Sequence, residues 1–148
     1  MFNMKLLIVP SIQLVEQMTK DFIDYAKNWV DYSKYIHKIY GGQEKISNKQ
    51  ITISTYQSLM NSPKKSFEKF TTLMVDECHI IFNNNDSIKA VNKIINNCVN
   101  AENKFGFSGS LLNSHSTELQ LTGLFERPIT NRRMLRPTKT KVRRIRRR

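Results

Sequence analysis

Four short apolar runs in this sequence each end in small, polar or charged residues, and this repeated pattern constrains the fold more than any other feature. The segments between the runs carry apolar residues at helical spacing. Strands that alternate with helices predict an α/β fold with a layered, mostly parallel sheet. Because the carboxyl ends of parallel strands meet at one edge, we expect a site there. The four polar ends are Pro10-Ser11, Ser54-Thr55, Asp76-Glu77 and Ser108-Gly109-Ser110.

The order of the elements follows from the apolar pattern. Lys5–Val9 is predicted to be a buried strand, and Ser11 is a good N-cap for an amphipathic helix from Ile12 to about Trp29. Tyr25 and Trp29 are expected to pack on the apolar face of that helix. Further strands are predicted at 36–40, 51–54, 73–75 and 104–108, with helical segments at 56–60, 64–70 and after the polar loop 83–87.

The composition fits a cytoplasmic protein with one folded domain. The chain has 148 residues, of which 39% are hydrophobic. It contains no apolar run long enough to cross a membrane, and its first residues do not resemble a signal peptide. The two cysteines, Cys78 and Cys98, are expected to be reduced. A zinc set formed by Cys78, His79, Cys98 and His115 lacks the paired-cysteine spacing of such sites.

The positive charge is concentrated at the end of the chain. Of the 24 Lys and Arg residues, 11 lie in residues 127–148, a segment that contains none of the 12 acids. We therefore expect a folded domain over residues 1–128 and an arginine-rich, disordered tail over residues 129–148. Such a tail would bind any polyanion through counterion release, without reading sequence.

The chemistry is expected around the acidic strand end. The run Leu73-Met74-Val75 is followed by Asp76, Glu77 and, after one residue, His79. One carboxylate can hold Mg²⁺ while the other orients or deprotonates a water molecule. Taken alone, the same residues also fit a solvated strand end and a core histidine, so the pattern leaves both interpretations open.

Four motifs in order give the sequence a specific resemblance. They lie at residues 8–18 (IVPSIQLVEQM), 54–59 (STYQSL), 75–79 (VDECH) and 106–111 (GFSGSL). With these motifs, the chain resembles the first RecA-like domain of superfamily 2 helicases, and within them the UvsW-type phage DNA repair helicases. The similarity runs from about Lys5 to about Pro128. The implied fold is a partial RecA-like domain, of the P-loop NTPase type, carrying motifs Ia to III.

The resemblance implies catalytic roles for five residues. Asp76 would hold the Mg²⁺ of Mg-ATP, usually through water, and Glu77 would polarise the water that attacks the γ-phosphate. His79 would reach toward Ser108 and Ser110, and so link the nucleotide to the nucleic-acid side.

The resemblance also implies contacts with DNA, either branched or single-stranded. Two strand ends would present backbone amides and hydroxyls to phosphates, which positions a strand without specifying its sequence. A turn at two glycines falls where these helicases often approach DNA. The expected nucleic-acid residues are Pro10, Ser11, Gly41, Gly42, Thr55, Tyr56 and Gln57, of which Tyr56 fits the core equally well.

Two parts of such an enzyme are not found in the sequence. None of the five glycines fits the phosphate loop G-x₄-G-K-[ST], and we expect no second RecA-like domain within the 148 residues. ATP and Mg²⁺ would then be used only with a partner polypeptide that supplies the phosphate loop and the second domain. We expect no ATP hydrolysis by the chain alone, and a gap or an exposed apolar edge in the sheet. The alternative is a non-enzymatic DNA-binding or decoy module derived from a helicase.

Overall fold

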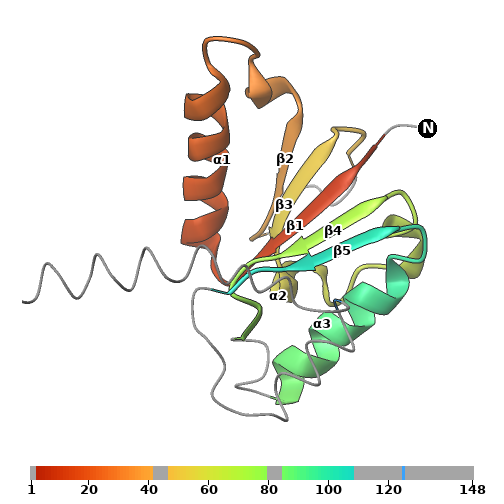
Figure 1. The fold of residues 1–148 in the computed structure, drawn as a ribbon. Helices are drawn as coiled ribbons and strands as arrows, with labels where there is room; N and C mark the ends of the chain where they lie inside the picture. Colours follow the sequence, from red (N-terminus) through yellow and green to blue (C-terminus); the bar gives the residue numbers. More distant parts are fainter. Residues whose placement is uncertain (1–2, 42–46, 80–84, 109–124, 126–148) are drawn as a thin grey trace, which may run out of the picture.

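The computed structural model describes residues 3–41, 47–79, 85–108 and 125. Five strands in it form one parallel sheet in the order β2-β3-β1-β4-β5 (Figure 1). The strands are β1 (Lys5–Val9), β2 (Ile36–Ile39), β3 (Ile51–Thr55), β4 (Thr72–Val75) and β5 (Asn103–Gly106). The helices are α1 (Ile12–Ala26), α2 (Tyr56–Leu59) and α3 (Asn85–Asn97), with 3-10 turns η1 (Tyr32–Lys34) and η2 (Lys64–Ser66).

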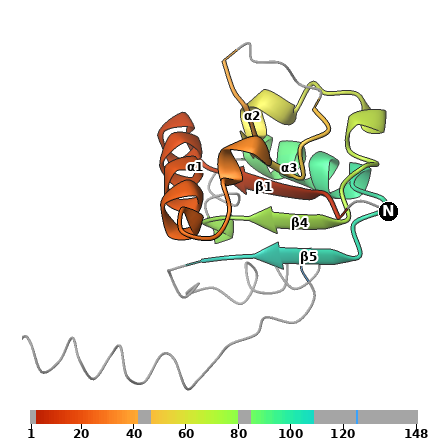
Figure 2. The same ribbon diagram turned by 90° about the horizontal axis from the view of Figure 1, so that it is seen from above.

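Two apolar clusters cover the two faces of the sheet, and β1 contributes to both by strand alternation. Leu6 and Ile8 belong to the cluster on the side of α2 and α3. Leu7 and Val9 belong to the cluster on the side of α1. Figure 1 shows α1 on one side of the sheet and α2 and α3 on the other, and Figure 2 shows β1, β4 and β5 side by side in that order. The predicted α/β class with a mostly parallel sheet is therefore confirmed, and all five strands are parallel.

The end of the first helix differs from the prediction. Helix α1 ends at Ala26, and the amides of Trp29 and Val30 donate to the Ala26 carbonyl, which closes a turn. Tyr25 is 85% exposed and Trp29 is 87% exposed, so the expectation that both pack on the apolar face is wrong. Tyr25 lies about 100° around the helix from the buried Ala26, and Trp29 lies beyond the helix end.

Other boundaries differ by a few residues. The expected helix at 64–70 is the single turn η2, and the strand at 104–108 ends at Gly106. Among the described residues, no helix is long and apolar enough to cross a membrane. Gly42, Ser110, His115 and the predicted tail lie outside the described residues.

Candidate active site at the carboxyl edge of the sheet

The turn after β4 is fixed to the strands on both sides. The Asp76 amide donates to the Ile8 carbonyl at 2.8 Å, which extends the pairing with β1. On the other side, the Phe107 amide donates to Val75 and the Cys78 amide donates to the Phe107 carbonyl, each at 2.8 Å. These bonds hold the acidic turn at the carboxyl edge of the sheet, between the ends of β1 and β5.

The backbone of Glu77 is strained. Its φ angle is 46°, in the left-handed region, and it is the only residue other than glycine with positive φ in the described part of the chain. This conformation costs roughly 1–3 kcal/mol and persists where neighbouring contacts impose it. Here the hydrogen-bonded amides of Asp76 and Cys78 on either side supply those contacts. Strain of this kind occurs often at functional sites.

The His79 ring connects the acidic turn with the end of β5. Its Nδ1 atom lies 2.8 Å from Ser108 Oγ and 3.1 Å from Glu77 Oε2. The His79 and Glu77 side chains are partly buried. The structure therefore brings together three of the predicted catalytic residues, while the role that each of them has stays a prediction.

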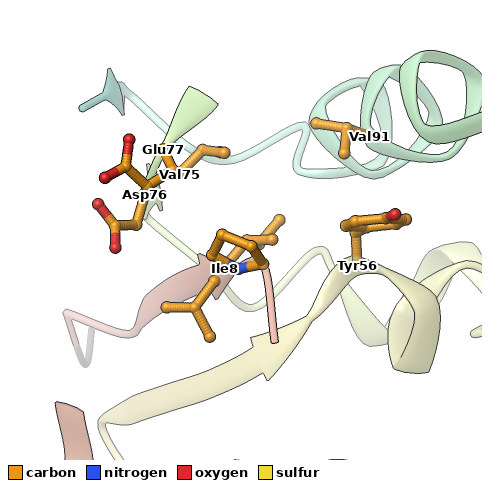
Figure 3. A pocket seen from close by; sticks show the side chains of 8 residues that line it. Ile8, Tyr56, Val75, Asp76, Glu77 and Val91 are labelled. Atoms are coloured by element: carbon orange, nitrogen blue, oxygen red, sulfur yellow. The ribbon is translucent and has the colours of Figure 1, made fainter. Parts of the chain in front are cut away.

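A small pocket opens beside the acids (Figure 3). In Figure 3 the Tyr56 ring lies on the side of Val91, and the carboxylates of Asp76 and Glu77 lie on the other side. The Tyr56 hydroxyl is 2.9 Å from Ser87 Oγ at the start of α3, and its ring packs against the core. Tyr56 thus packs against the core and also lines the pocket. The lining residues are Ile8, Val9, Pro10, Tyr56, Val75, Asp76, Glu77 and Val91.

The hydroxyls at two other strand ends cap helices. Ser11 Oγ accepts a bond from the Leu14 amide at 3.3 Å. Thr55 Oγ1 accepts from the Ser58 amide at 3.3 Å, and the Thr55 residue is buried. The neighbouring Gln57 is exposed. Both hydroxyls therefore stabilise local structure, and any contact of Thr55 with a phosphate would involve its backbone.

At the carboxyl edge of the sheet, Glu16 forms a hydrogen-bonded cluster that the sequence analysis did not predict. Its carboxylate accepts bonds from Lys38 Nζ, at 3.0 Å to each oxygen, and from the Tyr40 hydroxyl. Bonds from Tyr40 and Lys38 lower the pKa of Glu16, while the bonds to Glu16 raise the pKa of Lys38 and of Tyr40. The cluster joins α1 to the end of β2, next to Gly41, whose φ is +51°.

The chemistry of the acids at the strand end fits Mg²⁺. Asp76 offers carboxylate oxygens, and a bound phosphate with water would complete the octahedral shell that Mg²⁺ requires. No group of three or more His, Cys, Asp or Glu residues that could hold a metal occurs in the part of the chain that the structure describes. Both cysteines are free and buried, and burial raises the pKa of Cys78 and raises that of Cys98 to about 12.

Comparison with known proteins identifies a family and several relatives. The model of the family described as "Type III restriction enzyme, res subunit" matches residues 3–113. The ATP-dependent DNA helicase UvsW of Enterobacteria phage T4 is 33% identical over 137 residues, which cover 88% of this chain and 26% of the relative. The chain thus spans about a quarter of the length of that relative.

Two solved structures are similar to this chain in fold. A crystal structure of the T4 UvsW helicase matches 84% of this chain and 43% of its own chain, with a TM-score of 0.64 and 33% identity. A DEAD box protein from Methanococcus jannaschii matches 82% of this chain and 34% of its own, with a TM-score of 0.63. At 22% identity, this second match shows the fold alone.

Proposed function

Because the chain belongs to the Type III restriction enzyme res-subunit family, we propose that it is a portion of an ATP-dependent DNA helicase that hydrolyses Mg-ATP at Asp76 and Glu77. The contact network of His79 with Glu77 and Ser108 is the observation that supports this most. These contacts connect Glu77 with Ser108, which follows β5. The resemblance implies that this connection links the bound nucleotide to the DNA side.

The two acids have separate roles in the proposed reaction. Asp76 would hold Mg²⁺ through water, and the metal would neutralise charge on the phosphates. Glu77 would accept a hydrogen bond from the attacking water and take up its proton. The hydrogen-bonded turn holds both carboxylates at the edge in advance, which reduces the reorganisation needed in the transition state.

The proposed activity needs parts that these 148 residues do not contain. The 148 residues contain no G-x₄-G-K-[ST] sequence, whose backbone amides and lysine hold the phosphates in such enzymes. Two carboxylates can serve the metal and the water but cannot bind the phosphates, because like charges repel. We therefore infer that these 148 residues alone do not hydrolyse ATP, and that a phosphate loop and a second RecA-like domain have to be supplied to them.

Binding of Mg-ATP tests the proposed site. The chain is mixed with the parts of T4 UvsW outside the aligned region, and the affinity for a fluorescent ATP analogue is measured with and without Mg²⁺. Asp76→Asn should weaken Mg²⁺-dependent binding, whereas Glu77→Gln should leave it within about threefold, since it keeps the shape of the side chain. Asp21→Asn, in an exposed position of α1, is the matched control. Equal binding by the Asp76 and Asp21 variants would refute the metal role.

A DNA-binding or decoy module is the second candidate, and the charge distribution favours it. Residues 127–148 hold 11 Lys and Arg residues and no acid. Deleting residues 131–148 should then sharply reduce DNA affinity and its salt dependence. Equal DNA binding at low salt by the truncated chain would exclude this candidate.

A further inference from the structure

Glu16, Lys38 and Tyr40 form a closed set of contacts on the α1 side of the sheet, which we call the Glu16 cluster. Lys38 Nζ lies 3.0 Å from each carboxylate oxygen of Glu16, and the Tyr40 hydroxyl donates to the same carboxylate. The Lys38 ammonium also lies 5.9 Å from the centre of the Tyr40 ring, a distance at which a cation is attracted to an aromatic face. Each side chain therefore contacts both of the others.

Strand alternation explains why the cluster forms. Lys38 and Tyr40 are two positions apart, so both side chains point to the same face of β2 and its continuation. The Tyr40 ring packs against the apolar cluster on the side of α1, and α1 itself packs against β2 (Figure 1). Glu16 lies four residues after the start of α1, about 6 Å along the helix axis. The Glu16 cluster thus joins the first turns of α1 to the residue that precedes Gly41.

The register of the strands places two predicted DNA-contact positions at one level. Ile39 of β2 pairs with Ser54 of β3, and Ser54 pairs with Ile8 of β1. Gly41 and Pro10 each follow this row by two residues, and their strands are two positions apart in the sheet. At the usual strand spacing, the two strand ends are roughly 10 Å apart. A single nucleic-acid strand can therefore span both positions, provided that they keep a fixed separation.

Packing on Gly41 itself does not fix this turn. Gly41 is exposed and has a φ of +51°, and apart from its chain neighbours no described atom lies within 4 Å of the place that a Cβ would take. The position of the turn therefore depends on the residue before it, Tyr40, which is bonded to Glu16. The pair of Glu16 and Lys38 is partly exposed, so it adds little to the stability of the fold. Its contribution is geometric, because it ties a strand end to a helix.

We propose that Glu16 is a positioning residue, which acts through Lys38 and Tyr40 to hold the Gly41 turn at a fixed distance from the start of α1. The backbones at Gly41 and Ser11 would then meet the phosphates of one nucleic-acid strand without prior rearrangement, which lowers the cost of binding. A carboxylate near phosphates would by itself weaken binding, because like charges repel. Here the bond from Lys38 offsets that charge. This inference rests on the proposed function, because it assigns a role within the DNA contacts that the resemblance implies.

The test is a titration with single-stranded oligothymidylate, followed by NMR at the Gly41 and Ser11 backbone amides of the full chain. These two signals report the edge of the sheet rather than the basic residues 127–148. Glu16→Ala, which keeps a good helix former in α1, should weaken the affinity measured at both amides about three- to tenfold. Asp21→Ala removes an exposed acid of the same helix and is the matched control, which should bind as the wild type does or slightly more tightly. A purely electrostatic role would give both variants tighter binding.

A double variant separates positioning from independent contacts. Tyr40→Phe removes the hydroxyl bond to Glu16 and should also weaken the affinity at both amides. Glu16→Ala combined with Tyr40→Phe should lose little more than Glu16→Ala alone, because the two residues act through one bond. Additive losses would contradict the inference. Urea unfolding checks that every variant is folded under the conditions of the titration.

Three further results would overturn the inference. The first is an affinity at Gly41 that Glu16→Ala leaves unchanged or raises, and the second is an equal loss with Asp21→Ala. The third is no response at either amide in the wild type, because no strand would then be held there. Phosphate release by the chain mixed with the remaining parts of T4 UvsW is recorded in parallel. A Glu16-dependent response without ATP turnover would overturn the proposed function and keep this inference, whereas turnover without a Glu16 effect would do the reverse.

Discussion

The centre of the sheet and its β5 end differ both in sequence and in burial. In the centre, β1 and β3 have neighbours on both sides, and every residue of β1 from Leu6 to Val9 is buried. In β5 no residue is buried, although its sequence includes an aromatic residue. The acidic turn lies between these two regions. The difference has two causes: β1 is apolar and central, whereas β5 has one large apolar side chain, Phe105, and pairs with β4 alone among the described strands.

The largest expected difference is in the free energy of unfolding, when one side chain in each region is truncated. Leu73→Ala removes a side chain with no exposed surface, and should lower the free energy of unfolding by about 2–5 kcal/mol. Phe105→Ala, on the neighbouring strand, should change it by about 0.5 kcal/mol or less in the free chain, as exposed positions do. Urea unfolding measures both. Similar losses for the two variants would mean that the Phe105 side chain is buried.

Gly106→Ala should have the next largest effect, because β5 is tightly packed on its other face. The new Cβ would lie 2.8 Å from the Phe125 ring and 3.1 Å from Cys78 Sγ. Overpacking of this kind costs about 1–3 kcal/mol. Combining the variant with Phe125→Ala should relieve part of the clash, so the two losses should not add. Strict additivity would show that Phe125 does not pack on Gly106.

Removal of the hydroxyl at the pocket should have a moderate effect. Tyr56→Phe breaks the bond to Ser87 that joins α2 to α3, and should cost about 0.5–1.5 kcal/mol. Ser87→Ala removes the same bond from the other side, and the double variant should lose little more than either single one. Independent, additive losses in thermal unfolding would indicate that the hydroxyls have other partners.

The smallest expected effect is that of Glu16, an exposed residue of α1 that accepts bonds from Lys38 of the opposite edge strand, β2, and from Tyr40. The folded pKa of Glu16 is lowered from 4.5 by the bonds from Tyr40 and Lys38. The stabilisation is therefore present above about pH 4.5 and is lost as the pH falls through the folded pKa. The melting temperature of Glu16→Gln should be below that of the wild type at neutral pH and should converge with it in acid. A difference that persists unchanged in acid would rule out the charge as its cause.

Much of the fold could be predicted from the sequence, because strand ends in this chain are marked by residue type. The polar residues after Val9 and Val75 mark the edge where the structure places the acidic turn. The end of α1 could not be predicted, because apolar spacing continues to Trp29 although the chain turns at Ala26. A gap or an exposed apolar edge was expected in the sheet. No gap separates the five described strands.

One contact of the candidate site was predictable, whereas its backbone geometry was not. His79 and Ser108 were expected to meet on the grounds of resemblance, and they lie 2.8 Å apart. The left-handed backbone of Glu77 has no sequence signal, since glycine is the usual residue in that conformation. The bonds of Glu16 to Lys38 and Tyr40 join residues 22 and 24 positions apart, and nothing local in the sequence marks such a pair.

The most direct test of the account is ATP turnover with DNA present. Phosphate release is measured for the chain alone and for its mixture with the remaining parts of T4 UvsW, using the wild type, Glu77→Gln and the control Glu68→Gln, an exposed glutamate before β4. We predict no turnover by the chain alone. The mixture should turn over ATP with the wild type and with Glu68→Gln, and Glu77→Gln should reduce the rate on the order of 100-fold or more. Glu77-dependent hydrolysis by the isolated chain, or undiminished turnover by the Glu77→Gln mixture, would contradict the account.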